Sequence, residues 1–130
     1  MSRDFRKIKA WQLADELTVM TYSMTTQFPH DEMYGLISQL RGATSSVAAN
    51  IAEGANRSTQ KEYLHFLSMA RGSLAGAEYF FHLSKRLSYL SVSDYNKIDE
   101  GRKEAASVLN ELMRAVHSES TTAIKSPDYL

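Results

Sequence analysis

Four polar residues near the middle of the chain are the first candidates for chemistry: Gln39, Asn50, Glu53 and Arg57. Asn50 and Glu53 are three residues apart, so their side chains would share one face of a helix. Amide, carboxylate and guanidinium groups in one cluster could bind a ligand or a phosphodiester. The same groups could also form a satisfied polar network that fixes the following turn and its packing. The sequence leaves both interpretations open.

The patterns that mark catalysis or cofactor binding are not found in the sequence. The four histidines lack the i, i+4 spacing and the HExxH pattern of metal sites: His30, His65, His82 and His117. No serine has the G-x-S-x-G context of a hydrolase, and the glycines do not form a phosphate-binding loop. We therefore predict a protein that is not an enzyme and that has no metal or cofactor.

Basic residues suggest a possible nucleic-acid surface. Residues 1–9 contain four basic residues and one acidic one, whereas residues 10–40 contain four acidic residues and no basic one. Further basic residues lie around the expected second turn: Arg41, Arg57, Lys61 and Arg71. They could be a solvated face or a patch that contacts phosphates. Because the formal net charge is zero, any binding to RNA or DNA should be weak.

Apolar residues recur at helical spacing in four segments, which predicts helices near residues 9–27, 31–53, 59–89 and 94–117. For example, Leu13, Leu17 and Met20 are separated by four and three residues. Long helices joined by short connections are usually antiparallel neighbours. The expected fold is an all-α, antiparallel up-down-up-down four-helix bundle.

Several residues are expected to mark helix ends or close contacts. Asp31 and Ser58 would cap the starts of the second and third helices, and Gly54 would be the left-handed residue after the second. Gly72 and Gly76 lie inside the third helix, where each glycine costs about 1 kcal/mol relative to alanine. We expect the close approach of a neighbouring backbone to offset that cost.

The chain is expected to form one bundle domain at residues 9–117, with a basic arm at 1–8 and a flexible tail at 118–130. It contains no cysteine, which favours a reducing cytoplasm. The charged start is not followed by the apolar region of a signal peptide. No apolar run approaches the roughly 20 residues that a membrane-spanning helix needs.

Aromatic residues crowd the third helix: Tyr63, Phe66, Tyr79, Phe80, Phe81 and Tyr89. They lie nearly all round the helix, so one core cannot bury them all. If some of these residues pack in the core and the others pack against a second subunit, all of them are buried. We therefore predict a homo-oligomer. Stacking on nucleic-acid bases is the alternative.

Several short motifs, in order and with specific spacing, resemble one family. They are Trp11-Gln12, Phe28-Pro29, Tyr34-Gly35-Leu36, Gln39-Leu40-Arg41 and Asn50-Ile51-Ala52-Glu53-Gly54. The match extends over roughly residues 5–90. The chain is similar to small four-helix-bundle proteins encoded in intervening sequences of bacterial 23S ribosomal RNA genes.

This resemblance implies a four-helix bundle and a ring-shaped homopentamer, the form of known relatives. A related group, the accessory proteins of diversity-generating retroelements, implies nucleic acid and a reverse transcriptase as partners. Relatives often have two basic residues after the Gln-Leu pair, where this chain has Arg41 and Gly42. That departure weakens the implication of nucleic-acid binding.

Two functional hypotheses follow. In the first, the protein is an oligomeric interaction module that recruits a protein partner. In the second, it is a weak nucleic-acid-binding accessory protein, either for the RNA of its own locus or for a reverse-transcriptase system.

Overall fold

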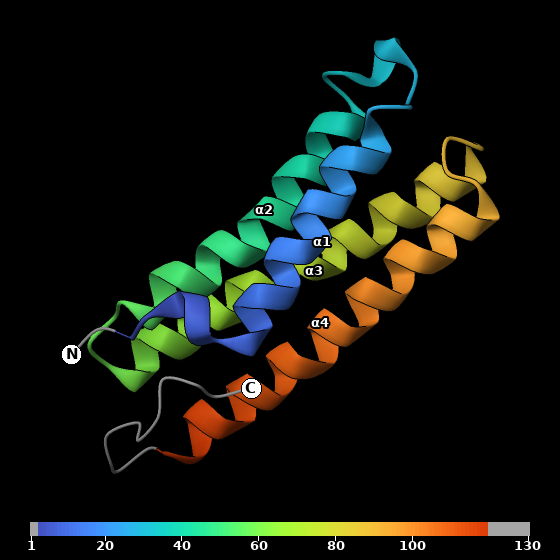
Figure 1. Ribbon diagram of the computed structural model, residues 1–130. Helices are drawn as coiled ribbons and strands as arrows, with labels where there is room; N and C mark the ends of the chain where they lie inside the picture. The colour runs from blue at the N-terminus through green and yellow to red at the C-terminus, as the bar shows by residue number, and fades with distance from the viewer. Residues whose placement is uncertain (1–2, 120–130) are drawn as a thin grey trace.

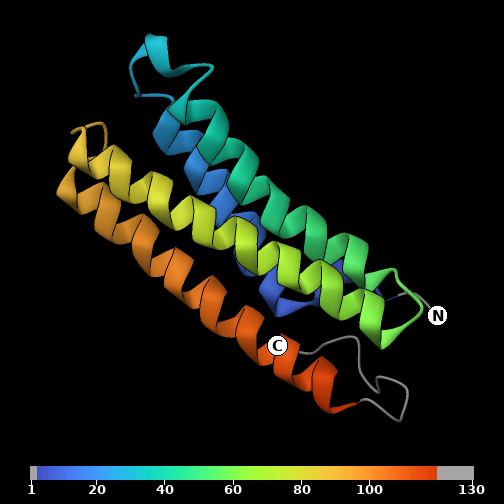
Figure 2. The same ribbon diagram turned by 180° about the vertical axis from the view of Figure 1, so that it is seen from behind.

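Residues 3–119 of the chain are described by a computed structural model, and they form four long helices (Figure 1). The long helices are α1 (Lys9–Thr25), α2 (Leu36–Ala55), α3 (Gln60–Arg86) and α4 (Val92–Ser118). Two short 3-10 helices are η1 (Phe5–Lys7) and η2 (His30–Glu32). The same arrangement seen from behind shows α3 beside both α2 and α4 (Figure 2). The predicted all-α four-helix bundle is confirmed.

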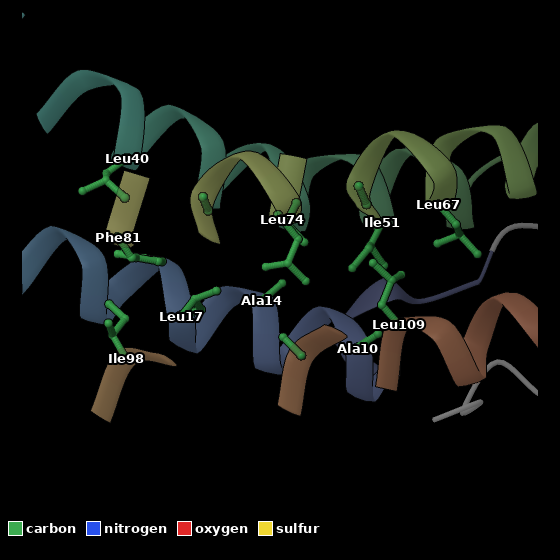
Figure 3. Packing of buried hydrophobic residues seen from close by; sticks show 14 of the residues in the cluster. Ala10, Ala14, Leu17, Leu40, Ile51, Leu67, Leu74, Phe81, Ile98 and Leu109 are labelled. Carbon is green, nitrogen blue, oxygen red and sulfur yellow. The ribbon is translucent and has the colours of Figure 1, made fainter. Parts of the chain in front are cut away.

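Each long helix packs against two others, in the cyclic order α1, α2, α3, α4 and back to α1. Their buried faces meet in one core, where Leu17, Phe81 and Ile98 turn toward one another from three helices (Figure 3). All three side chains are almost completely buried. Full burial of a large apolar side chain contributes about 2 kcal/mol, so this shared core is the main source of stability.

The start of α2 differs from the sequence prediction. His30–Glu32 forms a separate 3-10 turn, and α2 begins only at Leu36. The capping group is the carboxylate of Glu32, which accepts a hydrogen bond from the Leu36 amide at 3.1 Å. The backbone at Gly35 (φ −110°, ψ −112°) still lies outside the helix, so α2 does not begin directly after Asp31. Asp31 is therefore not its N-cap residue.

The ends of α3 also shift. Thr59, rather than Ser58, caps its start, because the Thr59 hydroxyl accepts the Glu62 amide at 3.1 Å. The helix ends at Arg86 and not near 89, since Ser88 adopts a left-handed conformation with φ 62°. At the start of α4, Ser91 accepts the Asp94 amide at 3.0 Å.

The prediction for Gly54 is wrong. Gly54 lies inside α2, and no described glycine has a positive φ. A Cβ there would come within 2.9 Å of the Phe66 Cβ and 3.0 Å of the Tyr63 ring. Gly54 therefore allows α2 and α3 to approach closely, as was expected at Gly72 and Gly76. At Gly72 and Gly76 a Cβ would meet no atom of the described chain within 4 Å apart from the neighbouring residues and backbone of its own helix.

The described part of the basic arm is attached to the bundle. The backbone amide and the guanidinium of Arg3 both donate to the Ala55 carbonyl, at 3.2 and 3.1 Å. The Arg3 guanidinium also lies 4.5 Å from the centre of the Tyr63 ring. Ile8 is completely buried. Except for the last residue of α4 and Glu119, the predicted tail lies outside the described residues.

Within residues 3–119, no helix combines the length and the apolar character needed to cross a membrane.

Candidate functional site

Asn50 belongs to a polar bridge between α2 and α3. Its side-chain amide donates to the carbonyl of Ser46 at 2.9 Å and to the Ser46 hydroxyl at 3.0 Å. That hydroxyl lies 3.0 Å from the hydroxyl of Ser73 on α3. All three side chains are half-buried, and their polar groups satisfy one another. This geometry favours a structural role for Asn50 at the helix interface.

Glu53 and Arg57 lie together at the end of α2. With Asn56 they line a shallow surface cavity of about 320 Å³. The Arg57 guanidinium stacks over the Phe66 ring at 4.5 Å, a favourable cation–π geometry. Gln39 is exposed and precedes Asn50 by eleven residues on α2, which separates them by roughly 16 Å along the helix axis. The four predicted cluster residues therefore do not converge on one point.

The four basic candidates lie in three separate places on the bundle. Arg41 faces α1, where its Nε donates to the Thr25 hydroxyl at 2.9 Å. Arg57 lies at the α2–α3 turn, and Lys61 is exposed in the first turn of α3. Arg71 lines a cavity between α3 and α4. A single chain does not bring these four residues into one patch.

The cavity around Arg71 contains residues that sequence patterns alone did not suggest as a site. It measures about 400 Å³ and is lined by Leu64, Ser68, Arg71, Asn110, Met113, Arg114 and His117. The α3 residues recur at intervals of four and three, as do Asn110, Arg114 and His117 on α4. That spacing places each set on one helix face, but it does not reveal that the two faces meet.

A second long-range contact joins the loops at the other end of the bundle. The Tyr89 hydroxyl donates to Glu32 at 3.0 Å, and this hydrogen bond raises the pKa of Tyr89. Glu32 thus connects the start of α2 with the α3–α4 loop.

Across the described residues, no three histidine or carboxylate side chains are grouped closely enough to hold a metal ion. Tyr63, whose pKa is raised to about 12 by burial, lies in the core against Arg3 rather than in a cleft.

Comparison with known families agrees with this architecture. The family model of the 23S rRNA-intervening sequence protein matches residues 6–111, from η1 through most of α4. The chain belongs to the 23S rRNA-intervening sequence protein family. The family suggested by the sequence motifs is thereby confirmed. No curated protein sequence matches significantly.

Among solved structures, this 23S rRNA-intervening sequence family member is similar to a crystal structure from Bacteroides thetaiotaomicron. That structure is of a protein of unknown function from the S23 ribosomal protein family. The TM-score is 0.73 at 18% sequence identity, and the match covers 81% of this chain and 98% of the other. At this identity the likeness shows a shared fold.

Proposed function

We propose that this protein is a homo-oligomeric interaction module without enzymatic activity. The single observation that carries the proposal is the outward side of α3, where Gly72 and Gly76 have open space above them. Two glycines inside a helix cost about 1 kcal/mol each relative to alanine. No packing within the described chain offsets this cost at either position. The backbone of a second copy, approaching closely, would do so.

The side chains around these glycines support the same assembly. Met69 and Tyr79, one turn or less from the glycines, are 38% and 56% exposed although both are large and apolar. By contrast, Tyr63 and Phe81 point into the core. The helix therefore has one apolar face that the bundle buries and a second, with Met69 and Tyr79, that the bundle leaves open. A second subunit covering the open face would bury that apolar surface.

The size of the proposed assembly comes from the family resemblance, which implies five subunits. A ring of this kind would present repeated surfaces, and repetition strengthens the binding of a multivalent partner. We propose the cytoplasm as its compartment and a protein partner as its target.

Light scattering coupled to size exclusion tests the assembly, and a mass five times the 14.7 kDa of one chain is expected. Gly72→Ala and Gly76→Ala should each lower the mass at a given concentration, because a methyl group would separate the two backbones. Gly42→Ala is the matched control, since its Cβ would likewise meet no described atom within 4 Å apart from its own helix's neighbouring residues and backbone. A wild-type monomer at micromolar concentration would contradict the proposal.

Nucleic-acid binding is the second candidate. The observation that favours it is the exposure of Arg57, within the α2–α3 turn, and of Lys61, just after it. One chain offers few such contacts, but a ring would repeat them along a strand.

A further inference from the structure

We propose that the groove between the first half of α3 and the second half of α4 binds the phosphoryl group of a small, nucleotide-sized organic phosphate. We call this the α3–α4 groove, and it is lined by Leu64, Ser68, Arg71, Asn110, Met113, Arg114 and His117. All of these lining residues belong to one chain.

The α3–α4 groove concentrates positive charge without a countercharge. Arg71 from α3 and Arg114 from α4 both line it, and none of its lining residues is acidic. Within residues 3–119, neither guanidinium takes part in a salt bridge or a hydrogen bond. Guanidinium groups present planar pairs of donors that match phosphate oxygens. Two such groups from different helices therefore fit a doubly charged phosphoryl group.

The other half of the same helix pair shows the opposite arrangement. There, Arg102 on α4 lies 2.8 Å from Asp99 and 3.6 Å from Glu78 of α3. Only 12% of the Arg102 side chain is exposed. At one end of the α3–α4 interface an internal arginine is thus neutralised, whereas at the other end two arginines have no acidic partner among residues 3–119.

The open end of the groove is held in place by Gln60. Its side-chain amide donates to the carbonyls of Val116 at 2.7 Å and His117 at 3.0 Å. These bonds join the first turn of α3 to the last turn of α4 and satisfy carbonyls that a helix end leaves without partners. The positions of Arg114 and His117 relative to α3 are consequently defined before any ligand binds.

The remaining lining residues suit an organic body attached to the phosphate. Leu64 and Met113 supply an apolar surface, and Ser68 and Asn110 supply hydrogen-bonding groups. The cavity of about 400 Å³ lies within the range of small-molecule sites, which is roughly 300–1,000 Å³. The imidazole of His117 adds a further donor or acceptor at the rim.

Isothermal titration calorimetry on the full chain tests the site with inorganic phosphate, AMP and adenosine as probes. AMP should bind with a saturable, salt-sensitive heat, inorganic phosphate should bind more weakly and compete, and adenosine should not bind. Arg71→Gln and Arg114→Gln should each weaken AMP binding roughly ten-fold, since a charge-assisted hydrogen bond is lost. Arg86→Gln is the matched control on the same helix, because Arg86 is exposed and lies outside the groove.

Circular dichroism and size exclusion should show that the variants keep the helical content and assembly of the wild type. The proposal is overturned if neither phosphate nor AMP gives a saturable signal at millimolar concentration. It is equally overturned if Arg86→Gln weakens binding as much as the groove variants, or if adenosine binds as well as AMP. A different result is that AMP does not bind, but an oligonucleotide binds and its binding requires Arg71 and Arg114. The groove would then be a site for a nucleic-acid polymer instead.

Discussion

The hydroxyl of Tyr89 donates to the carboxylate of Glu32 across 57 positions of sequence, at 3.0 Å. The same carboxylate caps α2 by accepting a hydrogen bond from the Leu36 amide. The Glu32 side chain therefore joins the start of α2 to the loop that contains Tyr89. Tyr89→Phe should therefore lower the melting temperature. Glu32→Ala should lower it further, because it removes the cap as well. Thermal unfolding followed by circular dichroism measures both. Equal melting temperatures for Tyr89→Phe and the wild type would show that the hydrogen bond adds no stability.

Burial of Tyr63 predicts a loss of stability in alkali. Its pKa is raised to about 12 by desolvation, whereas a tyrosine in an unfolded chain ionises near pH 10. Between these values the unfolded chain releases a proton that the folded chain keeps, so stability falls as pH rises. The loss attributable to Tyr63 should be about 2 kcal/mol at pH ~12 and approach about 3 kcal/mol above it.

Tyr63→Phe is the matched variant for this pH effect, because it keeps the ring under Arg3 and removes only the ionisable group. Urea unfolding at several pH values should show a shallower alkaline decline for this variant than for the wild type. If the stability of the two proteins falls equally as pH rises, the decline comes from ionisable groups other than Tyr63.

Gly54→Ala should destabilise the protein although alanine favours helices. The added methyl would lie within 2.9 Å of the Phe66 Cβ, an atom fixed to the α3 backbone. Overpacking of this kind costs about 1–3 kcal/mol, which exceeds the gain in helix propensity of about 1 kcal/mol. We expect a net loss of roughly 1 kcal/mol in the free energy of unfolding measured with urea.

Ser88→Gly should stabilise the end of α3. Ser88 has a φ of 62°, and the amides of Ser88 and Tyr89 donate to the carbonyls of Lys85 and Ser84 in the pattern of a Schellman motif. Glycine adopts this conformation without the steric cost that an L side chain carries. The expected gain is about 0.5–1 kcal/mol, after allowing for the greater freedom of glycine in the unfolded chain. Ser88→Ala, which keeps a Cβ, should show no gain.

Reversing charge at the α2–α3 turn tests the nucleic-acid hypothesis. Arg57→Glu and Lys61→Glu should weaken binding to all RNA and DNA sequences alike and flatten the salt dependence by about one unit per lost contact. Fluorescence anisotropy at two salt concentrations measures this, with Lys97→Glu on α4 as an exposed control. If the intact assembly does not bind at low salt, only the protein-interaction function remains.

The sequence alone determined which segments are helical and which family they belong to. Helical periodicity is a local property: Leu13, Leu17 and Met20 indicate an amphipathic helix whatever lies beside it. Short connections then favour antiparallel neighbours, and the ordered motifs add the family. The fold could therefore be predicted before any contact was known.

Only the tertiary structure decided which faces meet. Asn50 was predicted beside Glu53, yet it bonds to Ser46 and thereby reaches Ser73, because the rotation of α2 about its axis turns Asn50 toward α3. Gly54 was expected to be the left-handed residue after α2, but it is the last residue but one of that helix, has no positive φ and packs on α3.

The same reason explains the α3–α4 groove. Arg71 and Arg114 are 43 positions apart, and each alone reads as an ordinary surface arginine. They line one cavity because α3 and α4 run antiparallel with these two faces adjacent. Spacing along a chain defines a face, whereas packing in the core sets the rotation that brings two faces together.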